Sequence, residues 1–68
     1  MTIGQAIRKA REHRGLTQQK LAELSGIAVL TLQGWERDRF TPTVILLMGV
    51  ADILEISLDE LVGRTRKF

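Results

Sequence analysis

The sequence predicts an all-α protein that folds as one compact bundle of about five short helices. Three observations lead to this prediction. Apolar residues recur with the spacing of one helical face along most of the chain. Threonine or serine precedes several of these segments, where a helix N-cap is expected, and glycine follows several of them. The alternation of apolar and polar residues that is typical of strands is missing, and 68 residues suffice for a single domain.

The first helix is expected to begin after Thr2 and to end at Gly15. Thr2 and Gln5 have the spacing of a capping box, in which each side chain accepts a hydrogen bond from the other residue's backbone amide. Gly15 can adopt the left-handed conformation that ends a helix. The apolar face of this helix is expected to consist of Ile3, Ala6, Ile7 and Ala10.

Two shorter helices follow, one of about two turns that begins after Thr17 and is stopped by Ser25-Gly26, and one from roughly Val29 to Glu36. Thr17 is placed to cap the first of them, and Gly26 is placed to end it. The residues expected to face the core are Leu21, Ala22 and Leu24 in one helix and Leu32 and Trp35 in the other. Two helices joined by a glycine-containing turn within about 20 residues form a helix-turn-helix unit, whose second helix can enter the major groove of DNA.

Two more helices complete the predicted bundle. Pro42 interrupts the chain before them, because proline disfavours helical conformation in the residue that precedes it. Thr43 can cap a fourth helix from Val44 to about Leu54, and Ser57 can cap a fifth that continues through Val62.

The fourth helix is apolar on nearly every side. Its inward face is predicted to consist of Val44, Leu47, Met48, Ala51 and Leu54. Apolar residues also occupy the other side, namely Ile45, Leu46, Val50 and Ile53. A helix that is apolar all round is normally buried all round. We therefore expect this second set to form a dimer or partner surface; the alternative is a partly exposed helix covered by its neighbours.

Charge is distributed unevenly, although the net charge is only +2. Residues 1–40 contain seven Lys/Arg and four Asp/Glu, whereas residues 41–63 contain four acids and no Lys/Arg. We expect a helical domain of residues 1–63 and a basic tail of residues 64–68. A molecule with one basic side is suited to contact with phosphates.

Several kinds of site are not expected. The chain has no cysteine and one histidine, so no metal site is predicted. The sequence contains no recognisable nucleophile–base pair or phosphate-binding loop, so we expect no catalytic residues, no cofactor and no small-molecule ligand. The longest apolar run, Val44 to Val50, is too short to span a membrane. The absence of cysteine is compatible with a cytoplasmic location, which we expect.

A specific pattern of residues extends over nearly the whole chain. It consists of Arg11, Gly15-Leu16-Thr17-Gln18, Leu21-Ala22, Ser25-Gly26-Ile27, Leu32, Trp35-Glu36-Arg37, Pro42 and Leu54-Glu55-Ile56-Ser57-Leu58-Asp59-Glu60-Leu61. This pattern resembles the phage repressor and Cro-type helix-turn-helix domains, among them the Xre-like transcriptional regulators. The resemblance implies the lambda repressor-like fold and a homodimer that binds double-stranded DNA at a near-palindromic operator.

The resemblance also implies roles for single residues. Gln18, at the start of the second helix, and Arg37 and Arg39, beyond the third, would contact DNA phosphates. Free amides at a helix start favour phosphate as well. Arg11 and Glu36 correspond to the family's ion pair between the first and third helices.

The third helix departs from the family pattern at the positions expected to face outward and to read bases: Val29, Leu30, Gln33 and Gly34. Family members mostly carry polar or basic side chains at three of these positions and a serine or threonine cap in place of Ala28. In one interpretation Val29 and Leu30 contact thymine methyl groups and Gln33 recognises adenine. Gly34 would then allow the helix to approach closely.

These residues leave two hypotheses for function. The leading one is a sequence-specific, double-stranded-DNA-binding transcriptional regulator of the repressor kind. In the other, the apolar third helix binds a protein partner. The chain would then be a protein-interaction module with weak or no DNA binding of its own. The antitoxin of a toxin–antitoxin pair is a related alternative, and its candidate toxin-binding surface is the apolar face of Ile45, Leu46 and Ile53.

Overall fold

A computed structural model describes residues 2–62, which fold into five helices without any strand. The helices are α1 (Ile3–His13), α2 (Gln18–Ser25), α3 (Val29–Glu36), α4 (Val44–Leu54) and α5 (Leu58–Val62). The prediction of an all-α bundle of about five helices is therefore confirmed. Gly63 and the predicted basic tail lie outside the described residues.

Local sequence signals explain where the helices begin. The Thr2 hydroxyl accepts a hydrogen bond from the Gln5 amide at 3.1 Å, and the Gln5 side chain accepts one from the Thr2 amide at 3.0 Å. Thr17 caps α2 and Thr43 caps α4 in the same way, each through its hydroxyl. Ala28 has no such oxygen, so α3 begins without a side-chain cap.

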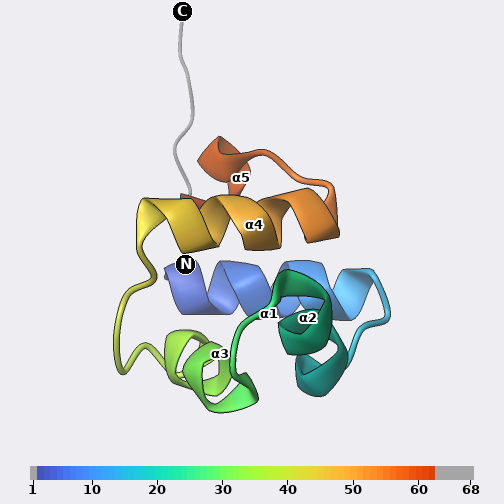
Figure 1. Ribbon diagram of the computed structural model, residues 1–68. Coiled ribbons are helices and arrows are strands. Elements are labelled where there is room, and N and C mark those ends of the chain that lie inside the picture. Colours follow the sequence, from blue (N-terminus) through green and yellow to red (C-terminus); the bar gives the residue numbers. More distant parts are fainter. Residues whose placement is uncertain (1, 63–68) are drawn as a thin grey trace, which may run out of the picture.

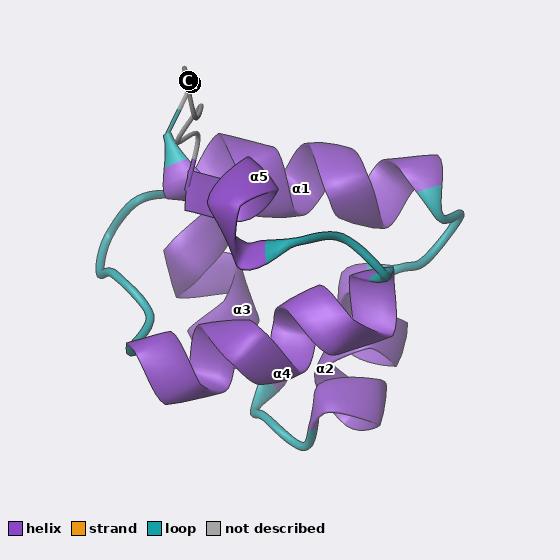
Figure 2. Ribbon diagram, turned by 90° about the horizontal axis from the view of Figure 1, so that it is seen from above, coloured by secondary structure: helices purple, strands orange, loops and turns teal. Residues whose placement is uncertain are grey.

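The helices close into a ring around one core. α1 packs against α3 and α5, α2 packs against α3 and α4, and α4 packs against α5. Figure 1 shows α4 and α5 on one side of α1 and the α2–α3 pair on the other, and Figure 2 gives the view from above. The α2–α3 pair therefore forms one end of the molecule.

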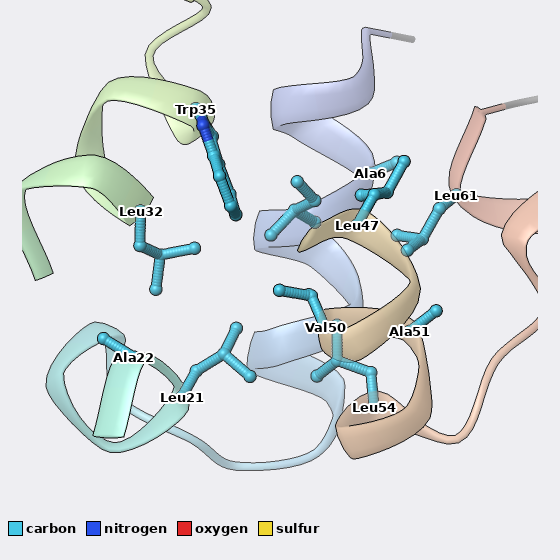
Figure 3. Close-up of a cluster of buried hydrophobic side chains, with 11 residues drawn as sticks. Ala6, Leu21, Ala22, Leu32, Trp35, Leu47, Val50, Ala51, Leu54 and Leu61 are labelled. Carbon is cyan, nitrogen blue, oxygen red and sulfur yellow. The ribbon is translucent and has the colours of Figure 1, made fainter. Parts of the chain in front are cut away.

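The core collects apolar side chains from all five helices. Figure 3 shows Leu21 of α2, Trp35 of α3 and Leu61 of α5 converging on the side chains of α4. Its fully buried members include Ile7, Leu32 and Leu54. The predicted inward positions of Leu32 and Trp35 are confirmed. Ile3 and Ala10, predicted to lie on the same face of α1, are only partly buried at the margin of this core.

The structure corrects the predicted faces of α4. Val50, assigned to a partner surface, is fully buried, because Leu47, Val50, Ala51 and Leu54 together make the inward face. Val44 and Met48, predicted inward, are exposed, as is Leu24 of α2. Ile53 packs at the edge of the core, and Ile45 and Leu46 are exposed. With apolar residues on every side of α4, the contacts with α2 and α5 decide which side is buried.

Candidate nucleic-acid interface

α2 and α3 are joined by a short turn that fixes their relative orientation. Gly26 adopts φ 70° at the end of α2, a conformation that glycine reaches without strain. The Ile27 amide then donates to the Ala22 carbonyl at 3.0 Å, so the chain reverses direction tightly. α3 follows two residues later at the outer end of the molecule (Figure 1).

A continuous chain of polar contacts connects α1, α2 and α3. The Arg11 guanidinium donates to both oxygens of Glu36, at 2.8 Å and 3.1 Å. The Gln18 side-chain amide donates to Glu36 at 3.1 Å. The Gln33 amide donates in turn to the Gln18 oxygen at 3.3 Å. The base-reading candidate Gln33 is thus oriented by Gln18, a candidate for phosphate contact.

The ion pair at the start of this chain is largely buried, with side-chain exposures of 11% for Arg11 and 3% for Glu36. Hydrogen bonding to Glu36 raises the pKa of Arg11 above its ordinary value, although burial acts in the opposite direction. Arg11 also donates to the Leu16 carbonyl at 2.8 Å. The pair therefore anchors the amino end of α2 as well as the end of α3.

The outward face of α3 differs in part from the expected one. Leu30 is 75% exposed, whereas Val29 is half-buried against the core. Gly34, predicted to face outward, is buried, because the ring of Phe40 lies directly over it. A Cβ at this position would collide with the ring. The Phe40 ring therefore packs directly on Gly34 and covers the Gly34 backbone, which cannot approach a ligand.

Contacts at two adjacent residues, Asp38 and Arg39, hold the segment after α3 in place. The Arg39 amide donates to the Gly34 carbonyl at 2.9 Å. Asp38 adopts φ 58°, and its carboxylate accepts from the Thr2 hydroxyl at 2.9 Å and from the Gly4 amide at 3.3 Å. The side chains of Arg37 and Arg39 lie on either side of this anchored residue, and both are exposed.

Two hollows lie on this end of the molecule and share Arg37. One, of about 300 Å³, is lined by Leu30, Gln33, Gly34, Arg37, Arg39 and Phe40. The other, of about 350 Å³, is lined by Arg8, Arg11, Gln18, Glu36 and Arg37. The structure therefore brings the predicted phosphate-contact residues Gln18, Arg37 and Arg39 to one surface beside Leu30 and Gln33.

Three further residues at this surface were not predicted from the sequence: Arg8, Asp38 and Phe40. Arg8 lines the second hollow beside Gln18. Arg8 lies three residues before Arg11, and this spacing places both side chains on one face of α1. Contacts that join distant parts of the chain, such as Asp38 with α1, leave no local signal. Leu30 and Arg37, by contrast, are exposed as expected.

Residues 2–62 contain neither a membrane-spanning helix nor a metal-binding cluster. Within this part of the chain, no helix combines the length and apolarity needed to cross a membrane. Nor do three or more histidine and carboxylate side chains gather there in a way that could hold a metal ion.

Comparison with known sequences gives matches over most of the chain. The model of the family described as helix-turn-helix (HTH_3) matches residues 7–61. The immunity repressor protein of Bacillus phage phi105 is 41% identical over 63 residues, which are 93% of this chain. The chain spans only 44% of that repressor's length.

Comparison with solved structures gives matches of similar extent. The P22 c2 repressor in complex with a synthetic operator superimposes with a TM-score of 0.88 at 25% identity, covering 96% of this chain and 98% of that one. SinR, described as the master regulator for biofilm formation and solved in complex with DNA, gives a TM-score of 0.85 at 34% identity. That alignment covers 88% of this chain and 97% of the solved chain.

Proposed function

Because the chain belongs to the helix-turn-helix family, we propose that it is a sequence-specific, double-stranded-DNA-binding transcriptional regulator of the repressor kind. Two copies bind one near-palindromic operator, and α3 of each copy lies in the major groove. The relatives named above are repressors and a regulator, which points away from catalysis. One observation carries this proposal to the residues: the polar chain that joins Gln33 to Gln18 at the start of α2.

Phosphate contacts set the position of the protein on the duplex. Gln18 lies at the amino end of α2, where free amides and the helix dipole favour an anion. Arg37 and Arg39 extend from the segment that Asp38 and Phe40 hold in place. Arg8 lines the same hollow as Gln18 and Arg37, and it adds a fourth contact from α1.

Base discrimination rests on Leu30 and Gln33. A glutamine can form two hydrogen bonds with adenine in the major groove, and an apolar side chain can contact a thymine methyl group. Leu30 is well exposed for such a contact, whereas half-buried Val29 contributes only its outer edge. Gly34 supports this surface indirectly, because Phe40 packs on it.

The test compares Gln33→Ala with Arg37→Ala in fluorescence anisotropy, on a selected operator and on random duplexes. Gln33→Ala is expected to relax specificity at one base pair by about 1–3 kcal/mol. Arg37→Ala is expected to weaken binding to all duplexes alike and to reduce the salt dependence of log K by roughly one unit per bound copy. Equal losses for both variants on every duplex would contradict this division of roles.

The same titration separates the proposal from the protein-interaction module. Binding of the unmodified protein to random DNA should fall steeply as salt concentration rises, because counterions are released from the phosphates. A chain whose exposed Leu30 serves only a protein partner would show no such binding even at low salt.

A further inference from the structure

The outward side of α4 carries an apolar surface that the fold leaves uncovered. Ile45 is 81% exposed, Val44 62% and Met48 51%. Ile45, Met48, Gly49 and Asp52 recur at i, i+3, i+4 and i+7, so they share the side opposite Leu47, Val50, Ala51 and Leu54. We call Val44, Ile45, Met48, Gly49 and Asp52 the outward α4 face. Singly exposed apolar residues are common, but a contiguous set of large ones usually marks an interface.

Gly49 is a second observation at the same face. It lies in the middle of α4, where glycine is among the residues least favourable to a helix. Among residues 2–62, and apart from its chain neighbours and the nearby backbone of α4 itself, no atom lies within 4 Å of the place where its Cβ would be, so the described contacts do not require glycine there. A bare helical backbone does allow another backbone to approach closely. Gly49 therefore marks the point at which a second helix can cross α4.

The charges around the outward α4 face indicate which helix can pack against it. Between Arg39 and Arg64 the sequence contains no Lys or Arg, so the face is unsuited to phosphate. Asp52 is exposed near the carboxyl end of α4, and the first turn of α4 contains no acid. An acid is favourable beside the positive amino end of a helix. An antiparallel second α4 provides such an end for Asp52 and receives the same contact in return.

We propose that the outward α4 face binds the outward α4 face of a second copy of this chain, across a two-fold axis. In an interface of this kind the same patch is used twice. If Ile45 rests on Gly49 of the second copy, the two-fold axis passes near residue 47 of both α4 helices. Each residue on one side of position 47 then faces the residue equally far on the other side in the second copy. That register also places Asp52 beside Pro42 and the N-cap Thr43 of the second copy.

This inference deepens the proposed function, since it names the surface through which the two operator-bound copies meet. Stable interfaces bury roughly 800 Å² per partner around an apolar centre. Val44, Ile45 and Met48 supply that centre, and exposed Leu46 and Phe40 lie within a few residues of it along the chain.

The first test is sedimentation equilibrium without DNA, on the full chain and on two matched variants. Ile45→Glu places an acid in the first turn of α4, which favours the helix and leaves the monomer fold intact. It should weaken self-association about 30-fold or more, the effect of losing a central contact. Leu24→Glu changes a leucine that is 46% exposed on α2 and should leave self-association unchanged.

Gly49→Ala gives a test that depends on the sign of the effect. On a free face, alanine favours the helix and raises the melting temperature by the same amount at every protein concentration. On a crossing point, the added methyl group weakens the dimer, so self-association falls even though the monomer is more stable. The second outcome is expected.

The register is tested by disulfide trapping, because the chain has no cysteine of its own. A mixture of Ile45→Cys and Gly49→Cys should form the mixed disulfide faster than either variant alone forms its own. The proposal is overturned if the unmodified chain stays monomeric up to about 1 mM. It is also overturned if the Ile45→Glu variant self-associates as strongly as the unmodified chain. Ile45→Glu should still bind random DNA with a steep salt dependence, so failure of the dimer surface is distinguishable from failure of DNA binding.

Discussion

Glu36 accepts hydrogen bonds from two side chains that come from different helices. Arg11 of α1 and Gln18 of α2 both donate to its carboxylate, which is almost completely buried. A buried ion pair adds little net stability, because desolvation offsets much of its attraction. It does fix the positions of Gln18 and, through it, Gln33. The pair therefore serves mainly to orient the surface around α3.

Removing Arg11 alone should unfold most of the protein. Arg11→Ala leaves the Glu36 carboxylate buried without its partner, at a cost of about 3–5 kcal/mol in the free energy of unfolding. A core of this size supplies roughly 3–5 kcal/mol in total. Circular dichroism at 25 °C measures the folded fraction of this variant, and urea denaturation measures the stability of the unmodified protein and of the double variant. The double variant Arg11→Met with Glu36→Leu should recover stability, and no recovery would argue against this explanation.

Gly34 and Phe40 should behave as a coupled pair. With Phe40 present, Gly34→Ala overfills the contact and is expected to cost about 1–3 kcal/mol. In a Phe40→Ala background the same change meets no ring and should stabilise α3, by up to about 1 kcal/mol. A double-mutant cycle in urea measures this coupling. Additive effects would show that the ring does not rest on Gly34.

At the scale of the helices, α3 is the element with an incomplete start. The N-caps of α1, α2 and α4 each use a threonine hydroxyl, but α3 begins at Ala28. Ala28→Ser should raise the free energy of unfolding by about 1 kcal/mol, because serine accepts a hydrogen bond from a free amide of the first turn. Thermal unfolding without DNA measures the gain. Ala28→Val is the control and should bring no such gain.

Helix boundaries were predictable because their causes are local. A capping threonine or a terminal glycine acts within one turn, so Thr2, Thr17, Thr43 and Gly26 could be read directly from the sequence. The buried side of α4 was only partly predictable, because a helix that is apolar on every side has no amphipathic pattern to mark the side that packs against its neighbours. Val50 was placed on the wrong side for this reason.

The surface around α3 was predictable in composition but not in detail. Periodicity correctly turned Leu32 and Trp35 inward, and it left Leu30 and Gln33 on the outer side. It could not show that Phe40 folds back over Gly34, because that contact depends on the path of the segment after the helix. The link between Gln18 and Gln33 likewise arises only once the turn brings the two helices together.

At the scale of the whole molecule, charge differs between the two sides of α1. Arg8 and Arg11 of α1 and Arg37 and Arg39 after α3 lie around the α2–α3 end, whereas α4 and α5 carry acids. Like charge would repel DNA from the α4–α5 end and leave the other end free to approach it. The distribution of charge therefore favours the α2–α3 side for contact with DNA.

Dimer geometry predicts a strict dependence on operator spacing. The two α3 helices of a bound dimer should lie about 34–36 Å apart, which is one turn of DNA or 10–10.5 base pairs. Inserting half a turn, about five base pairs, between the half-sites should reduce affinity to that of a single half-site. Anisotropy titrations on operators of graded spacing measure this. Affinity that is indifferent to spacing would mean that the copies bind independently.

Trp35 has a consequence for how all these variants can be followed. It is the only tryptophan, the chain contains no tyrosine, and its indole is buried between α3 and the rest of the core (Figure 3). Near 295 nm the unmodified protein therefore has a single fluorophore, which reports on the packing of α3. Unfolding should shift its emission to longer wavelength, whereas binding of DNA on the outer side of α3 should leave the wavelength unchanged. One optical signal can thus separate loss of fold from loss of binding without any label.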